Sequence, residues 1–255
     1  MNRSLYYYHN TKPRIEADKE LIGRIELHRQ LNPTMGAKKL AKLLSSAECL
    51  INHKRIARIL KENGLIVLQK RKRFRRCDEL LRVPAPKEVK ELNALWSIDF
   101  MCTRKINSFK FMILNMVDVG TRMAPRMTVE RSFTSMDVTE ELDQAITERG
   151  KPSGIITDNG AEFTSTHFKI WCKRRCITHH LTNKGSPAEN CFVESFNSCV
   201  RREVLDPNDF QTINKLRVKV EKWRKYYNEV RPHGSLSYQS PETYYRLKKH
   251  TDIAV

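Results

Sequence analysis

The chain has 255 residues, enough to bury a hydrophobic core in one large domain or two smaller ones. Apolar residues make up 40% of the sequence and charged residues 30%, a balance typical of globular proteins that excludes a disordered chain. No apolar run approaches the roughly 18–20 residues needed to cross a bilayer, and the first residues lack the apolar segment of a signal peptide. We therefore expect a cytoplasmic protein with no membrane partner.

The formal net charge of +18 is concentrated in the first third of the chain. Residues 1–90 hold 22 Lys and Arg against 9 Asp and Glu, whereas residues 91–255 hold 25 against 20. This asymmetry predicts a module that binds a polyanion, attached to a nearly balanced domain.

Three helices are predicted in the basic front segment from the spacing of apolar residues, over residues 14–30, 37–46 and 53–63. Asn52 can cap the third helix, which ends before Gly64. The last two helices resemble a helix-turn-helix, and the polar face of the third carries three predicted DNA contacts, Lys54, Arg55 and Arg58.

A dense run of positive charge, "KRKRFRR", follows at residues 70–76, and "VPAPKE" follows at 83–88. Like charges at this density repel one another, so we expect an extended linker that tracks DNA phosphates. A plain solvated linker is the alternative. The predicted phosphate contacts are Lys70, Arg71, Lys72 and Arg73, and the pair of prolines marks a domain boundary.

The pattern changes to alternating strands and helices from residue 95 onwards. Apolar runs predict strands at 95–101, 109–119, 122–129, 155–158 and 177–181, and helices at 134–148, 165–175, around Glu194 and at 212–228. The strand at 122–129 contains Pro125 and is expected at a sheet edge. The order predicts an α/β domain, a mixed sheet with helices packed against it.

Three acids occupy positions where solubility does not require them. Asp99 interrupts an apolar strand, Asp158 directly follows another strand, and Glu194 lies on a helix after a glycine-proline loop. Carboxylates at sheet ends are costly to desolvate unless a positive charge lies among them. Mg²⁺, with Mn²⁺ as a substitute, satisfies this requirement, and two ions can activate an attacking oxygen and stabilise a departing one. Asp118 and Glu189 are competing candidates.

The spacing of these acids makes the pattern specific. Between Asp99 and Asp158 lie 58 residues, and between Asp158 and Glu194 lie 35. With this spacing the chain resembles the DDE transposases and retroviral-type integrases, and within them the OrfB proteins of bacterial insertion sequences. The blocks that carry the resemblance are "WSIDF" (96–100), "TDNGAEFTS" (157–165), "KGSPAENCFVESFN" (184–197) and "YYNEVRPHGSLSYQSPETY" (226–244). Glu189 departs from the pattern, because the family commonly has glutamine there.

The resemblance implies an RNase H-like catalytic core behind a helix-turn-helix-like segment, with Asp99, Asp158 and Glu194 as catalytic metal ligands. It also implies cleavage at the ends of a mobile element and attack of the freed 3′-OH on target DNA. The implied partners are double-stranded DNA with terminal inverted repeats, further copies of the chain, and a protein or fusion from an upstream reading frame (OrfA). We assign residues 1–68 to the helical DNA-binding segment, 69–92 to the linker, 93–206 to the catalytic core and 207–255 to its C-terminal helical extension.

Further DNA contacts are predicted around the catalytic blocks, at Lys184, Asn190, Arg201, Arg231 and His233. Asn190 and Arg201 share a helix face with Glu194, and Arg231 and His233 belong to the "RPHGSL" turn. The alternatives are a polar helix face in water and a rigid C-terminal cap. Two rival functions remain, a DNA-binding regulator without catalysis and a structure-selective nuclease that cuts but never joins.

Overall fold

The computed structural model describes residues 12–46, 49–66, 89, 91–103, 106, 109–182 and 190–253. The chain divides into two compact units, Met1–Lys72 and Arg73–Val255, which we treat separately. Several residues with predicted functions lie outside the described residues, namely Lys70, Arg71, Lys72, Arg73, Lys184 and Glu189. In the described part of the chain, no helix has both the length and the apolar character needed to span a membrane.

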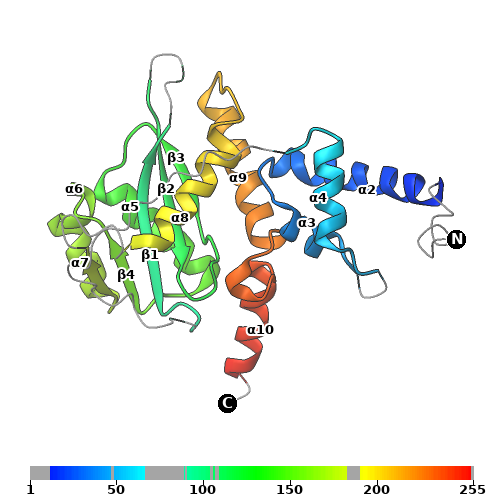
Figure 1. Cartoon of the computed structure of the whole chain (residues 1–255). Helices are drawn as coiled ribbons and strands as arrows, with labels where there is room; N and C mark the ends of the chain where they lie inside the picture. Colours follow the sequence, from blue (N-terminus) through cyan, green and yellow to red (C-terminus); the bar gives the residue numbers. More distant parts are fainter. Residues whose placement is uncertain are drawn as a thin grey trace, which may run out of the picture. The chain divides into compact units, whose positions relative to one another are not determined.

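In the described part of the N-terminal unit there are three helices, α2 (Lys12–Leu31), α3 (Ala37–Leu44) and α4 (His53–Glu62) (Figure 1). Their apolar faces form a small core that includes Leu21, Ile25, Leu40, Leu44, Ile56 and Ile59. The predicted cap is present, because the Asn52 side chain accepts a hydrogen bond from the backbone N–H of Lys54 at 2.9 Å. Helix α4 ends at Glu62, and Gly64, two residues later, adopts the positive φ of 64° that glycine tolerates best.

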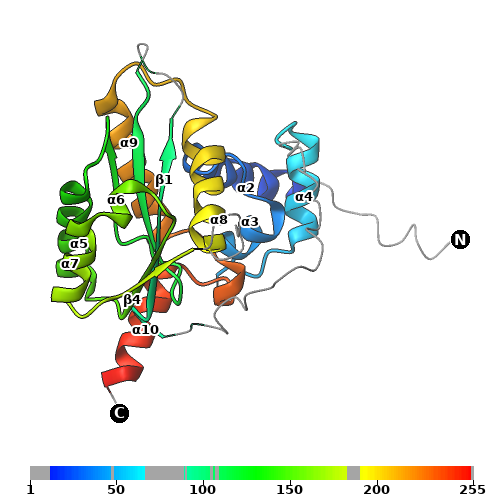
Figure 2. The ribbon, with the colours of Figure 1, turned by 90° about the vertical axis from the view of Figure 1, so that its left-hand side faces the viewer.

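The C-terminal unit is built on one five-stranded sheet in the order β3-β2-β1-β4-β5. Its neighbouring strands β1 and β4 are labelled in Figure 2. The strands are β1 (Leu95–Cys102), β2 (Met112–Asp118), β3 (Met127–Glu130), β4 (Gly154–Thr157) and β5 (Thr178–Leu181). Strands β1, β2 and β3 are antiparallel neighbours, whereas β4 runs parallel to β1 and β5 parallel to β4. The mixed sheet is the predicted one.

Strand β3 is at the sheet edge, as predicted, but is shorter than the expected 122–129. Arg122 has a φ of 59°, and Pro125 has no amide hydrogen for a strand ladder. The chain therefore enters β3 only at Met127. The expected helix at 165–175 is confirmed as α7 (Thr166–Arg174), whose first turn is capped by the Ser165 side chain, and a short helix that was not predicted, α6 (Ala161–Thr164), precedes it.

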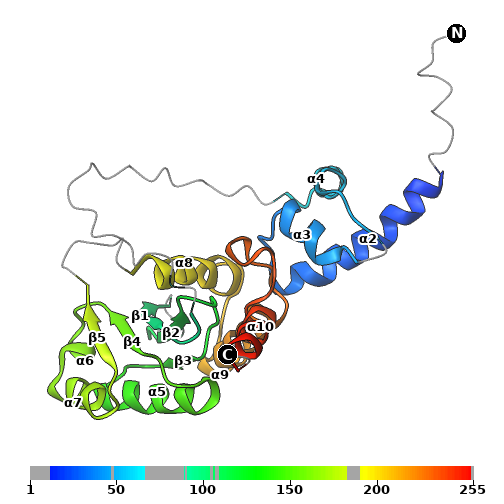
Figure 3. The same cartoon turned by 90° about the horizontal axis from the view of Figure 1, so that it is seen from below.

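Helices cover both faces of the sheet (Figure 3). On one face, α8 (Cys191–Val200), the π-helix η2 (Arg201–Leu205) and α9 (Ile213–Glu229) enclose a cluster with Ile113, Val117, Val193, Phe196 and Trp223. On the other face, α5 (Ser135–Arg149), α6 and α7 enclose Trp96, Ile98, Leu114, Phe163 and Phe168. The C-terminal part adds the short η3 (Gly234–Leu236) and α10 (Pro241–Ile253).

The alternation of side chains along β1 decides which face carries the acid. Trp96 and Ile98 pack in the cluster beneath α5 and α7. Because side chains alternate along a strand, Ser97 and Asp99 point to the opposite face, which α8 covers. Asp99 is therefore directed toward the helix that carries Glu194.

Candidate active site

Asp99 is held by two hydrogen bonds in a half-buried position in β1. Its Oδ1 accepts from the backbone N–H of Phe100 at 2.8 Å, and its Oδ2 accepts from the side-chain amide of Asn197 on α8 at 2.8 Å. Burial, followed by the negative charges of Asp158 and Glu194, raises the pKa of Asp99 to about 6 despite these bonds. Because both other acids act on Asp99, the fold brings the three predicted carboxylates into one electrostatic neighbourhood.

Asp158 reaches this neighbourhood through the parallel pairing of β1 and β4. The register pairs Leu95 with Gly154 and Ser97 with Ile156. Continued by two residues, the same register brings Asp158 beside Asp99. The side chain of Asp158 is exposed, and its Oδ1 accepts the backbone N–H of Gly160 at 3.0 Å.

Glu194 comes from the first turn of α8, which packs across β1 and β2. Its side chain reaches the surface, and partial burial raises the pKa of its carboxyl group. The glycine-proline loop before α8 lies outside the described residues. Glu194 is positioned by α8 through the contacts of this helix with β1 and β2.

Helix α8 is fixed to the sheet by polar contacts as well as by its apolar side. The Ser97 hydroxyl donates to Asn190 Oδ1, and Asn190 Nδ2 donates to the carbonyl of Ile98 at 3.3 Å. Further along α8, Asn197 Oδ1 accepts a hydrogen bond from Asn115 Nδ2 of β2 at 2.7 Å. Asn190 is buried, and both its amide oxygen and its amide nitrogen form hydrogen bonds within the protein. In the structure it therefore attaches α8 to β1, whereas the sequence suggested a DNA contact.

The chemistry of the three acids fits a divalent cation of the Mg²⁺ type. Their ligand atoms are carboxylate oxygens, which Mg²⁺ prefers. None of the ion pairs among the described residues involves Asp99, Asp158 or Glu194, so no Lys or Arg of this part of the chain balances their negative charge in an ion pair. In the same part of the chain, no three His, Cys, Asp or Glu side chains converge closely enough to enclose a metal ion. Repulsion between like charges accounts for carboxylates that share a field without meeting at one point.

Asp118, the competing candidate for a metal ligand, forms hydrogen bonds that stabilise a turn. It is buried at the end of β2, where it accepts hydrogen bonds from the Thr121 hydroxyl at 2.6 Å and from the Gly120 backbone N–H at 3.1 Å. Burial raises the pKa of its carboxyl group. These contacts stabilise the turn between β2 and β3, and they leave the Asp118 carboxylate enclosed within its own loop.

The predicted DNA contacts of the N-terminal unit differ in whether the side chain forms an ion pair within the protein. Lys54 is exposed. Arg55 and Arg58 both form ion pairs with Asp18 of α2, and Arg58 also pairs with Glu62. The two arginines therefore fasten α4 to α2, which the sequence did not reveal because Asp18 lies 37 residues before Arg55.

The DNA contacts predicted in the C-terminal unit also differ in how far their side chains are buried. Arg201 is exposed and remains available to a phosphate. Arg231 is only 5% exposed and forms an ion pair with Glu203, which is 2% exposed, so the predicted DNA contact of Arg231 is not compatible with its position. His233 is half-buried, with its ring edge-on to Tyr227 at 4.7 Å between centroids.

Asn115 was not predicted as a site residue, and the structure connects it to Asp99 through Asn197. The signal was present in "FMILNMVDV", where one amide side chain interrupts an otherwise apolar strand. A buried amide without a polar partner is costly, so such a residue indicates a partner elsewhere in the fold.

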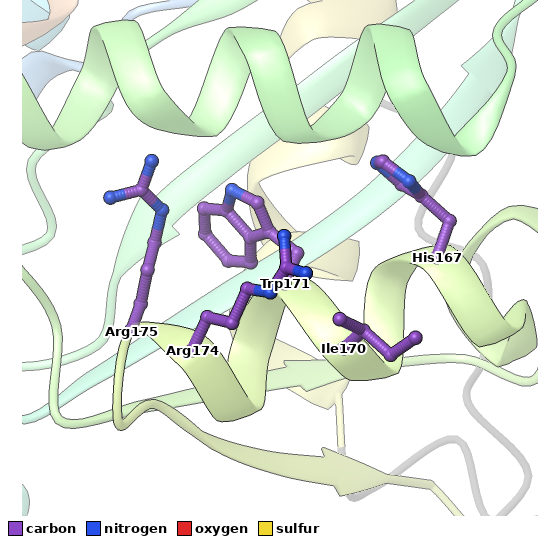
Figure 4. Close-up of a pocket in the computed structure, with 5 residues that line it drawn as sticks. All are labelled: His167, Ile170, Trp171, Arg174 and Arg175. Atoms are coloured by element: carbon purple, nitrogen blue, oxygen red, sulfur yellow. The ribbon is translucent and has the colours of Figure 1, made fainter.

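A pocket of about 320 Å³ lies apart from the acids, along α7 (Figure 4). It is lined by His167, Ile170, Trp171, Arg174 and Arg175. Helix α7 covers the face of the sheet opposite to α8. The pocket is therefore not part of the carboxylate site.

Comparison with known protein families divides the chain in a way that fits these observations. Residues 16–73 match the HTH-like domain family, and residues 90–187 and 175–241 match two families described as integrase core domains. Helices α3 and α4 and most of α2 lie in the first match, and the sheet with Asp99 and Asp158 lies in the second.

Individual relatives point the same way. The chain is 33% identical over 247 residues to the insertion element IS407 uncharacterized 31.7 kDa protein of Burkholderia multivorans, covering 96% of this chain and 86% of that protein. It is 26% identical over 242 residues to the transposase InsD for insertion element IS2 of Escherichia coli, covering 85% and 75%.

Among solved structures, the C-terminal unit has the fold of retroviral integrase cores. The HTLV-2 integrase catalytic core domain, solved in complex with magnesium, aligns with a TM-score of 0.50 and 23% identity over 61% of this chain and 97% of that domain. The fold is thus the RNase H-like integrase fold. From its domains and its relatives, the chain belongs to the transposases of bacterial insertion sequences, with an HTH-like domain followed by an integrase core domain.

Proposed function

We propose that this chain catalyses both chemical steps of transposition, metal-dependent cleavage at the ends of its element and transfer of the freed 3′-OH into target DNA. The observation that carries the proposal is the electrostatic neighbourhood of Asp99, Asp158 and Glu194, three carboxylates that no Lys or Arg of the described residues neutralises. The magnesium in the related integrase core supports the choice of cation.

In this proposal each of the three carboxylates is oriented by different contacts. Asp99 is oriented by Phe100 N–H and Asn197, Asp158 by Gly160 N–H, and Glu194 by the docking of α8. Together they hold Mg²⁺, or Mn²⁺ in its place, and two ions per site are expected. When bound, the cations supply Lewis-acid polarisation of the phosphate and charge stabilisation for the attacking and departing oxygens.

DNA is the proposed substrate and partner of both units. The N-terminal unit binds the terminal inverted repeats, with Lys54 on the exposed side of α4, and Arg201 contacts the phosphate backbone close to Glu194. Because two element ends must be held together, the active form is an oligomer on DNA, with an OrfA protein or fusion as a further partner.

The test is a cleavage and strand-transfer assay on labelled element ends with Mg²⁺ or Mn²⁺. Asp99→Asn, Asp158→Asn and Glu194→Gln should each abolish cleavage and joining while binding of the same DNA persists. Glu229→Gln removes an exposed acid from α9 and serves as the matched control, with activity equal to wild type. Full activity in one of the three variants would exclude that acid as a ligand, and cleavage without joining would favour a nuclease instead.

A further inference from the structure

Asn115 is an amide side chain in the middle of a buried strand. All residues of β2 from Ile113 to Asp118 are buried, and Asn115 itself is 0% exposed. The antiparallel register pairs Asn115 with Asp99, so the two side chains lie on the same face of the sheet, beneath α8.

Asn115 joins a chain of two hydrogen bonds that ends on the acid. Its Nδ2 donates to Asn197 Oδ1 at 2.7 Å, and Asn197 Nδ2 donates to Asp99 Oδ2 at 2.8 Å. An asparagine amide has one accepting end and one donating end. With its accepting end committed to Asn115, the Asn197 amide must present its N–H group to the carboxylate.

The opposite orientation of Asn197 is unfavourable while Asp99 is ionised. It would place the Asn197 oxygen against a carboxylate oxygen and its N–H group against the N–H group of Asn115. Two acceptors would then face each other, and two donors would face each other. Asn115 therefore selects the one orientation in which Asn197 supports the charged form of Asp99.

The arrangement has a cost in stability. Asn115 Oδ1 is buried and has no hydrogen-bond partner among the described residues. An unsatisfied buried acceptor is unfavourable, and an apolar side chain at this position would avoid it. A residue that weakens the core while orienting the partner of Asp99 is better explained by the site than by folding.

We propose that Asn115 is a positioning residue of the active site, which fixes the Asn197 amide so that Asp99 keeps the orientation needed to bind a divalent cation. The proposal rests on the function proposed above, in which Asp99 is a metal ligand. Asn115 does not touch the cation or the DNA in this scheme, and it acts through Asn197 alone.

The experiment measures Mn²⁺ binding to the full, DNA-free chain by the electron paramagnetic resonance signal of free Mn²⁺. Asn115→Leu removes the donor and resembles asparagine in shape, and Asn115→Ala removes it without risk of overpacking. Both should weaken Mn²⁺ binding about 10–100-fold, the usual effect of losing a residue that orients a ligand. The thermal unfolding temperature of at least one variant should equal or exceed that of wild type. Thr139→Val, a buried polar-to-apolar change on α5, is the matched control and should leave Mn²⁺ affinity unchanged.

A double-mutant cycle tests the route of the effect. If Asn115 acts through Asn197, the double variant of Asn115→Leu and Asn197→Leu should lose no more Mn²⁺ affinity than Asn197→Leu alone. Fully additive losses, or wild-type affinity in both Asn115 variants while Asp99→Asn binds weakly, would overturn the inference and leave the proposed function intact. Equal Mn²⁺ affinity of wild type and Asp99→Asn would instead overturn the metal role of Asp99, and the inference with it.

Discussion

Replacing Arg231 with methionine distinguishes a buried ion pair from a DNA contact. The Arg231 and Glu203 side chains are 6% and 1% exposed, and Glu203 also accepts the indole N–H of Trp223 at 2.9 Å. The ion pair joins the loop after α9 to the π-helix that continues α8. Its loss would remove the Arg231 charge from the buried Glu203 carboxylate.

The expected magnitude follows from the loss of one partner of a buried ion pair. Removing one partner of a buried ion pair typically costs about 3–5 kcal/mol, so Arg231→Met should lower the free energy of unfolding of the C-terminal unit by that amount. Combining it with Glu203→Gln, which keeps an acceptor for Trp223, should recover much of the loss because no buried charge is left unpaired.

Urea denaturation followed by tryptophan fluorescence is a suitable assay, because all three tryptophans, Trp96, Trp171 and Trp223, lie in the C-terminal unit. DNA affinity is measured in parallel under conditions where each variant is folded. An Arg231→Met chain with wild-type stability and strongly reduced DNA affinity would refute the reasoning and restore the DNA contact that the sequence suggested.

Three further outcomes are expected. Burial raises the pKa of Asp18, but hydrogen bonds from its two arginine partners outweigh burial, so its pKa is lowered. This carboxylate therefore stabilises the N-terminal unit above its unfolded pKa, and that stabilisation is lost as pH falls through its folded pKa. Asp18→Asn should therefore reduce the acid sensitivity of amide hydrogen exchange in α4, and unchanged pH dependence would contradict this. Gly160→Ala would place a Cβ 3.1 Å from Asp158 Oδ1 and should slow cleavage about 10–100-fold at nearly constant stability, whereas wild-type rates would show that the loop adapts. Asn190→Ala should lower stability by about 1–3 kcal/mol with DNA affinity unchanged, and the reverse result would return Asn190 to the DNA interface.

Features that depend on local chain properties were predictable from the sequence. The Asn52 cap and the glycine end of α4 follow from backbone chemistry within a few residues, and both are present. The order of strands and helices in the second unit follows from apolar periodicity, and it is also confirmed. Alternation along β1 places Asp99 on the face opposite to Trp96 and Ile98, and the structure adds that α8 covers this face.

Which charged side chains form ion pairs within the protein was not predictable, because their partners are distant in the sequence. Arg231 looks like a surface arginine until the fold brings Glu203, 28 residues away, into the core beside it. The same applies to Arg58, whose partner Asp18 lies 40 residues earlier on another helix. Composition identifies a basic segment, but only tertiary structure shows which of its cations are already neutralised.

The pairing of β1 with β4 has a consequence for insertions and deletions. An extra residue in the loop at 150–153 changes the sequence distance from Asp99 to Asp158 but leaves the strand register intact. An extra residue inside β4, between Ile156 and Asp158, would shift the carboxylate by about 3.3 Å along the strand and turn it to the other face of the sheet. Natural variation in length is therefore expected in the connection before Gly154, and the four residues of β4 should tolerate substitution but not a change in number.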